Sequence, residues 1–199
     1  MLFCKNNNMT YEELLINIDL NGYENVLPSV GKTFLDDSHW FVVCDDGDCH
    51  LFDKNGKEDD ISKIKEINED MIPKDIKKIV IPNSTMSIGY CAFYGCSILI
   101  SVKIPNSITS IWEWAFYNCS GLVSITIPNN VMSIGYSAFY NCSKLMSVTI
   151  GNGVTSIGKT AFYGCSELTN ITINKPIEHV KSMENYPWGI EDESIIKCN

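Results

Sequence analysis

The cysteines, histidines and acidic residues are the side chains of this sequence that could carry catalysis. The three histidines, His39, His50 and His179, stand in dissimilar segments, and the sequence contains no Ser-His-Asp spacing and no glycine-rich phosphate loop. Cys44 and His50 could form a nucleophile and its base, but nothing else in the sequence supports such a pair. We therefore expect that the protein is not an enzyme and needs no cofactor.

The acid-rich segment around Cys44 and Cys49 invites interpretation as a metal site. The two cysteines flank residues 45–48, which read DDGD, and His50 follows directly. A structural zinc site needs four well-spaced ligands, and residues 45–60 lack the oxygen spacing of an EF-hand calcium loop. We therefore expect solvated turn residues here and no metal.

The strongest candidates for binding a partner are the three residues Trp112-Glu113-Trp114. They interrupt a repeat in which the corresponding residues are Gly-Tyr-Cys, Gly-Tyr-Ser and Gly-Lys-Thr. Because Trp112 replaces a glycine, either the local bend differs or the indole points outward. Positions that break a local rule are often functional, so these residues are a candidate binding site, and a local packing change stays open as the other interpretation.

One tyrosine per repeat and one polar strand face are further candidates. Aromatic side chains are favoured interface anchors, although a duplicated tyrosine could instead shield the edge of the core. A flat polar strand face could recognise a partner, although serine and threonine there also serve solubility and strand propensity. The tyrosine candidates are Tyr94, Tyr117, Tyr140 and Tyr163, and the strand-face candidates are Lys103, Thr126 and Thr149.

These residues are positioned by a repeat of 23 residues that contains no insertion. The copies span residues 76–98, 99–121, 122–144 and 145–167, and a fifth copy begins at Leu168. A fixed period of this length is typical of a solenoid, in which each repeat forms one coil and neighbouring coils share a core.

Each copy has the same internal pattern. It reads L-x-x-I-x-I, then a proline or glycine, a second extended stretch that ends in isoleucine, and Ala-Phe-Tyr-Gly/Asn-Cys-Ser. Alternation within a strand places the isoleucines inside and the residue between them outside. We expect inward columns of Ile, Ala, Phe and Cys, a bend at the glycine after the second isoleucine, and about one helical turn over the last motif. The column of Cys96, Cys119, Cys142 and Cys165 predicts buried, reduced thiols.

The pattern LxxIxIPxxVxxIGxxAFxxC resembles the BspA-type leucine-rich repeat, also called the Treponema pallidum type, over residues 76–173. The resemblance implies a leucine-rich-repeat solenoid, curved, with a parallel β ladder on its concave side. Residues 174–199 look like the C-terminal cap of such arrays, with a short helix over 175–180 and a final strand over 194–198. Members of this type are often surface proteins of bacteria or protozoa that adhere to host or matrix proteins.

Residues 1–75 are expected to form a small α+β unit that caps the first coil. Without a cap, that coil would expose apolar side chains and a sheet edge. The expected elements are a helix over 9–20 with Thr10 as its N-cap, hairpin strands over 39–44 and 49–52, and a helix over 59–71.

Charge and hydropathy exclude some classes of partner. The formal net charge of −9 argues against direct binding of nucleic acid or anionic membrane, which needs clustered basic residues. No stretch approaches the length of a membrane-spanning helix, so no membrane insertion is expected. The start, MLFCKNNNMTYEELL, does not read as a signal peptide, which predicts a cytoplasmic protein, or one at the cell surface if a leader precedes it.

These features predict a non-catalytic module that binds another protein through a face of the solenoid. Two alternatives stay open, namely an intracellular acidic inhibitor of a basic or nucleic-acid-handling protein and an exported cell-surface adhesin. Self-association through an uncovered terminal coil is also open.

Overall fold

The computed structural model describes residues 10–21, 31–34, 39–43, 48–53, 55, 57–69, 71–72 and 74–199. The N-terminal elements are α1 (Tyr11–Asn21), β1 (Gly31–Phe34), β2 (His39–Val43), β3 (Cys49–Asp53), β4 (Glu58–Asp59), the 3-10 helix η1 (Ile61–Lys63) and β5 (Glu66–Ile67). The array holds β6 (Lys78–Val80), β7 (Ser87–Ile88), β8 (Ser101–Lys103), β9 (Ser110–Ile111), β10 (Ser124–Ile127), β11 (Ser133–Ile134), β12 (Ser147–Ile150), β13 (Ser156–Ile157) and β14 (Asn170–Ile173). The chain ends with α3 (Ile177–Lys181), the 3-10 helix η2 (Glu193–Ile195) and β15 (Ile196–Cys198).

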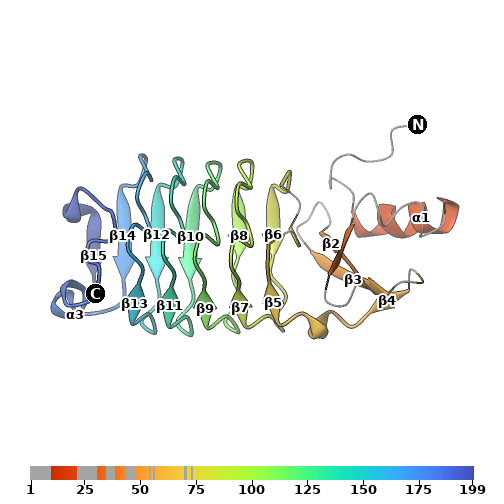
Figure 1. The fold of residues 1–199 in the computed structure, drawn as a ribbon, viewed down its shortest axis with the longest axis horizontal. Coiled ribbons are helices and arrows are strands. Elements are labelled where there is room, and N and C mark those ends of the chain that lie inside the picture. The colour runs from red at the N-terminus through yellow and green to blue at the C-terminus, as the bar shows by residue number, and fades with distance from the viewer. Residues whose placement is uncertain are drawn as a thin grey trace.

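The array is a parallel β-solenoid whose coils stand in a row, as expected from the repeat (Figure 1). One side carries the first strand of each coil, in the sheets β6-β8 and β10-β12-β14-β15. The other side carries the second strand, in the continuous sheet β5-β7-β9-β11-β13. Between strands of the repeats, partner residues are 23 apart in sequence, as in Ile125 with Val148 and Ile134 with Ile157, so the ladder register there is the sequence repeat itself.

The predicted inward columns form one core. The isoleucines that end the second strands are 2% exposed or less, and the alanine and phenylalanine columns are equally buried. The phenylalanines stack along the array, with ring centroids 4.7 Å apart for Phe93 and Phe116 and 5.1 Å apart for Phe116 and Phe139. Burial of the same residue types in every coil therefore makes one continuous core from units that could not fold alone.

The motif Ala-Phe-Tyr-Gly/Asn-Cys does not form the helical turn that we expected. In each coil the residue before the alanine has a left-handed backbone, as at Cys91 (φ 53°) and Ser137 (φ 50°). The phenylalanine then donates its backbone N–H to the alanine of the next coil, for example from Phe93 to Ala115 at 2.7 Å. A hydrogen bond between coils therefore satisfies this N–H, where a helix would use a hydrogen bond within the same coil. The third side of the solenoid is accordingly a row of turns.

The glycines after β11 and β13, Gly135 and Gly158, lie very close to the backbone of the preceding coil. A Cβ atom at Gly135 would lie 2.5 Å from the backbone nitrogen of Glu113, and one at Gly158 would lie 2.4 Å from that of Tyr136. Contacts this short do not occur between real atoms, so a side chain here forces the backbone to shift.

The N-terminal hairpin is confirmed, because β2 pairs antiparallel with β3, and β1 and β4 extend it to four strands. The helix α1 begins as expected, with a reciprocal capping pair in which the Glu13 N–H donates to Thr10 Oγ1 (3.2 Å) and the Thr10 N–H donates to Glu13 Oε2 (2.9 Å). Leu51 of β3 is fully buried in the same core as the array, so the hairpin packs onto the first coil.

The helix predicted over residues 59–71 is wrong. This segment forms β4, η1 and β5, and β5 pairs parallel with β7, placing Ile67 opposite Ile88. Ile64 and Ile67 are fully buried in the core of the array. Their spacing of three residues resembles a helical face, but hydrogen bonds to the first repeat and burial in its core outweigh that local preference. The segment thus adds a partial coil, and a boundary of the N-terminal unit at residue 75 stays a prediction.

The C-terminal cap has the expected short helix and final strand. The helix is α3, and β15 pairs parallel with β14, placing Ile196 opposite Ile171. Trp188 is fully buried and donates its indole N–H to the Glu184 carbonyl oxygen at 3.2 Å. A large apolar side chain therefore covers the end of the core.

Candidate interaction surfaces

The histidines and acidic residues of the N-terminal sheet join its strands to one another. His39 Nε2 lies 2.9 Å from Asp59 Oδ2, and His50 Nδ1 lies 3.1 Å from Glu58 Oε1. The pKa of Asp59 is held well below its usual value, chiefly by the bond from the Lys63 ammonium and then by the Asp60 N–H and His39. Cys44 lies outside the residues that the structure describes, so its pairing with His50 is not tested. Within the described part of the chain, no three His, Cys, Asp or Glu residues are grouped to hold a metal ion.

Trp112 stands outward at the end of β9, with 46% of its surface exposed. The corresponding residues in the coils on either side are Gly89 and Gly135, so no side chain flanks the indole along its column. The indole N–H donates to the hydroxyl of Ser110, two residues earlier, at 3.1 Å. The sequence allowed either a different local bend or an outward indole at Trp112, and the structure shows the outward indole.

Trp114 is half-buried between two tyrosines of the neighbouring coils. Its ring meets Tyr90 edge-on with centroids 5.0 Å apart, and it meets Tyr136 edge-on at 5.7 Å. Trp114 has a left-handed backbone (φ 54°), like the residues at this position in the other coils. Tyr90, Trp112, Glu113, Trp114 and Tyr136 thus occupy neighbouring positions on three coils, and we call them the Trp112 surface.

The four repeat tyrosines form one stacked row on the side of the turns. Centroids are 4.9 Å apart for Tyr94 and Tyr117, 4.9 Å for Tyr117 and Tyr140, and 5.2 Å for Tyr140 and Tyr163. Because each ring face meets the next ring, the row presents ring edges and hydroxyls to a partner. The two inner tyrosines of the row, Tyr117 and Tyr140, are half-buried. This geometry favours the alternative that the tyrosines shield the core edge.

Lys103, Thr126 and Thr149 lie on the outer face of the first-strand side, on β8, β10 and β12. Lys103 and Thr126 are exposed and Thr149 is half-buried. The Trp112 surface lies on the second-strand side, so the structure does not bring all the predicted residues into one site. It places them on three sides of the solenoid.

Sequence reasoning missed several exposed apolar residues beside these candidates. Met86 and Met132 are more than half exposed at the start of β7 and β11, on the sheet that carries Trp112. Ile100, Val123 and Met146 form a second exposed column just before the first strands. The sequence could have revealed these residues. They occupy repeat positions outside the inward columns, and an apolar residue at such a position must face outward.

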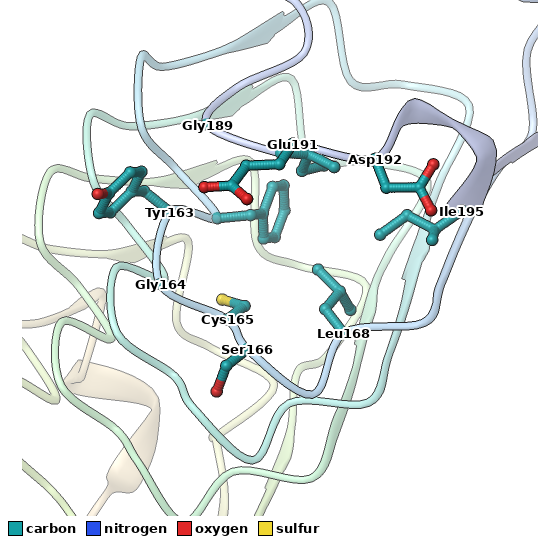
Figure 2. A pocket seen from close by; sticks show the side chains of 11 residues that line it. Tyr163, Gly164, Cys165, Ser166, Leu168, Gly189, Glu191, Asp192 and Ile195 are labelled. Atoms are coloured by element: carbon teal, nitrogen blue, oxygen red, sulfur yellow. The ribbon is translucent and has the colours of Figure 1, made fainter.

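A pocket of about 420 Å³ lies at the C-terminal end of the array (Figure 2). The backbone N–H of Phe162 donates to the carbonyl oxygen of Trp188, just as that of Phe139 donates to the carbonyl oxygen of Ala161. Trp188 thus takes the place of the repeat alanine, and Gly189 takes the place of the phenylalanine that would come next in the column. Cys165 and Leu168 are consequently half-buried, whereas their counterparts in earlier coils are fully buried. Asp192 at its rim accepts hydrogen bonds from Ser194, which lower the pKa of its carboxyl. The pocket is therefore an incompletely covered end of the core.

Charge is distributed unevenly along the chain. Residues 1–75 hold 17 of the 24 acidic residues and 7 of the 15 lysines. The repeats at 76–173 hold 5 lysines and 2 acidic residues. The acidic character therefore belongs to the N-terminal unit, and the solenoid itself is slightly basic.

The parallel strands and the 23-residue period place this protein in the class of β-solenoids. Comparison of its sequence with family models identifies the family. The sequence model described as the BspA type leucine rich repeat region matches residues 72–186 with six copies. The chain therefore belongs to the BspA-type leucine-rich-repeat family, as the sequence pattern indicated. No curated protein sequence matches it.

Solved structures share this fold at low sequence identity. A leucine-rich repeat protein of T. pallidum is 23% identical with a TM-score of 0.50, and the match covers 71% of each chain. The pneumococcal vaccine antigen PcpA is 24% identical with a TM-score of 0.55, over 75% of this chain and 40% of that one. A leucine-rich repeat protein of Eubacterium ventriosum is 22% identical with a TM-score of 0.55, over 71% of this chain and 35% of that one. This chain thus matches less than half the length of the last two.

No helix in the described part of the chain is long and apolar enough to cross a bilayer.

Proposed function

We propose that this chain is a non-catalytic protein-binding module whose partner docks on the Trp112 surface. The observation that carries the proposal is the exposed indole of Trp112, which stands alone in a column of glycines and is fixed by Ser110. An oriented aromatic side chain loses little conformational freedom when a partner covers it. Tryptophan and tyrosine are also the residues most enriched at the energetic centres of interfaces.

The neighbours of Trp112 extend this surface. Tyr90 and Tyr136 are each 45% exposed and flank Trp114, and Glu113 supplies a charge at the centre. Apolar patches rimmed by polar residues on soluble proteins commonly mark interaction sites. Leucine-rich-repeat solenoids of this type generally serve as interaction or adhesion modules, which agrees with this proposal.

The experiment compares capture of partners from the native host by three forms of the chain. The wild type and a Tyr163→Ser control should retain the same proteins, because Tyr163 lies in the tyrosine row. The double variant Trp112→Gly, Trp114→Ser returns both positions to residues that the other repeats use, so its fold should be unchanged. Retention of the same proteins by the double variant would remove the Trp112 surface from the proposal.

Two biological roles for this binding stay as proposals, an exported adhesin and an intracellular inhibitor. An exported adhesin is supported by the shared fold of a pneumococcal vaccine antigen. An intracellular inhibitor of a basic protein is supported by the acidic residues, but these lie in the N-terminal unit, so that unit would make the contact. Fractionation of the native host separates the two roles, because an adhesin must be recovered at the cell surface.

A further inference from the structure

The sheet on the first-strand side is interrupted between β8 and β10. Across the part of the chain that the structure describes, β6 pairs with β8 and β10 pairs with β12, but no ladder joins β8 to β10. The same two coils are joined on the other side, where β9 pairs with β11 and Ile111 lies opposite Ile134. The interruption therefore affects one side of one coil boundary.

The core is correspondingly less covered at this boundary. Val102 is 8% exposed, whereas its counterparts in the other coils are 3% exposed or less. Ile104 is half-buried, whereas Ile81, Ile127, Ile150 and Ile173 are 1% exposed or less. Val102 of β8 and Ile104, which directly follows β8, thus face the gap as well as the core.

The gap forms a groove of about 420 Å³ with an apolar floor and a polar rim. This volume is within the range of small ligand sites. Val102 and Ile104 lie at the floor, and Ser101, Lys103, Ser124 and Thr126 lie around them. The groove thus brings together two of the sequence-predicted residues, Lys103 and Thr126.

The charge of this groove is positive, although the whole chain is acidic. Lys103 is the one charged residue among those that line it, and the lining includes no carboxylate. Among the described residues, none forms a salt bridge with Lys103. Lys78 is exposed on the adjacent strand β6, opposite Ser101. An anion near the groove is therefore within reach of one ammonium group and close to a second.

We propose that this groove binds an extended acidic segment of a protein partner. An aliphatic side chain of the segment packs on Val102 and Ile104, and a neighbouring carboxylate pairs with Lys103. The hydroxyls of Ser101, Ser124 and Thr126 are available to the segment's main chain. Two lysines are too few to hold nucleic acid at physiological salt, where affinity depends on many phosphate contacts. The site is separate from the Trp112 surface and does not depend on it.

The test uses the whole chain and a capped hexapeptide of alternating glutamate and valine, with binding measured by calorimetry. Matched peptides alternate lysine with valine and glutamate with serine. We expect the glutamate–valine peptide to bind at least about tenfold more tightly than either control, because both the carboxylate and the aliphatic side chain are needed. Shifts in the methyl NMR signals of Val102 and Ile104 should accompany binding.

The variants locate the site. Lys103→Glu should weaken binding of this peptide by at least about tenfold, since it replaces attraction by repulsion. Lys103→Gln should weaken it less. Lys159→Glu should leave it within about twofold, because Lys159 follows β13 on the second-strand side, away from the groove. Trp112→Gly should have no effect, which keeps this test distinct from that of the Trp112 surface.

Three results would overturn the proposal. One is equal affinity for the glutamate–serine peptide or for a single-stranded oligonucleotide, which would mean that charge alone is recognised. Another is an unchanged affinity in folded Lys103→Glu protein, with folding checked by its thermal unfolding. The third is no measurable binding of the glutamate–valine peptide.

Discussion

The thiol of Cys142 donates a hydrogen bond to the carbonyl oxygen of Phe116, with Sγ and O 3.2 Å apart. The same bond recurs along the column, from Cys119 to Phe93 and from Cys165 to Phe139. Each thiol therefore joins its coil to the preceding one, and the cysteine is more than a small apolar filler. None of the seven cysteines that the structure describes forms a disulfide.

These thiols should react with alkylating reagents in a fixed order. Burial raises the pKa of Cys119 and Cys142 well above the usual range, so little thiolate is present at neutral pH. Cys165 is half-buried at the open end of the column. We expect iodoacetamide to label Cys165 at least about tenfold faster than Cys142, because the latter reacts only when the coil opens. Mass-spectrometric mapping of native protein measures both rates, and equal rates would contradict the buried column.

Substitution of Gly135 should destabilise the array. Gly135→Ala places a Cβ atom 2.5 Å from the Glu113 nitrogen, and both partners are backbone, so relief requires the coils to separate. We expect the free energy of unfolding to fall by about 1–3 kcal/mol, as for other overpacked sites. Urea unfolding measures the change, with Ser133→Ala, two residues earlier, as the control. A variant as stable as the wild type would show that the coils are not held this closely.

The repeat made most of the solenoid predictable from sequence. Inward columns such as that of Ile88 follow from strand alternation and recur every 23 residues, so each copy confirms the others. The segment 59–71 could not be assigned in this way. Its isoleucine spacing also fits a helix, and the contact that decides between the two is the pairing of Ile67 with Ile88, 21 residues away.

The candidate site was predictable only in part. The break at Trp112 is visible because glycine is the rule at that position, and the outward ring was one of two stated outcomes. The groove beside Lys103 has no such signal, because β8 follows the repeat pattern and yet does not pair with β10. Spacing between coils depends on packing along the whole array, which a pattern within one coil does not encode.

The C-terminal cap should weaken at alkaline pH through Tyr186. Burial, followed by the hydrogen bond from its hydroxyl to Glu193 Oε2 (2.9 Å), raises the pKa of Tyr186 to about 12. A pKa that is higher in the folded state gives stability that is complete below the unfolded value of about 10 and is lost as pH rises toward 12. Tyr186→Phe should remove this part of the pH dependence.

Thermal unfolding between pH 9 and pH 12 measures the effect as the difference between wild type and variant. Tyr163→Phe serves as the control, because it changes a tyrosine of the stacked row and leaves Glu193 untouched. If the unfolding temperatures of the wild type and of Tyr186→Phe change with pH in parallel over this range, the Tyr186 hydroxyl does not contribute to the pH dependence of stability.

The affinity of Trp112→Gly for a partner captured by the wild type tests the central proposal most directly. Calorimetry with that partner should show a loss of about thirtyfold or more, the effect of removing an interface residue worth at least about 2 kcal/mol. Urea unfolding of the same variant should match the wild type within about 0.5 kcal/mol, since glycine is the residue of the sibling coils and the indole is exposed. An affinity within about twofold of the wild type would contradict a partner site at Trp112.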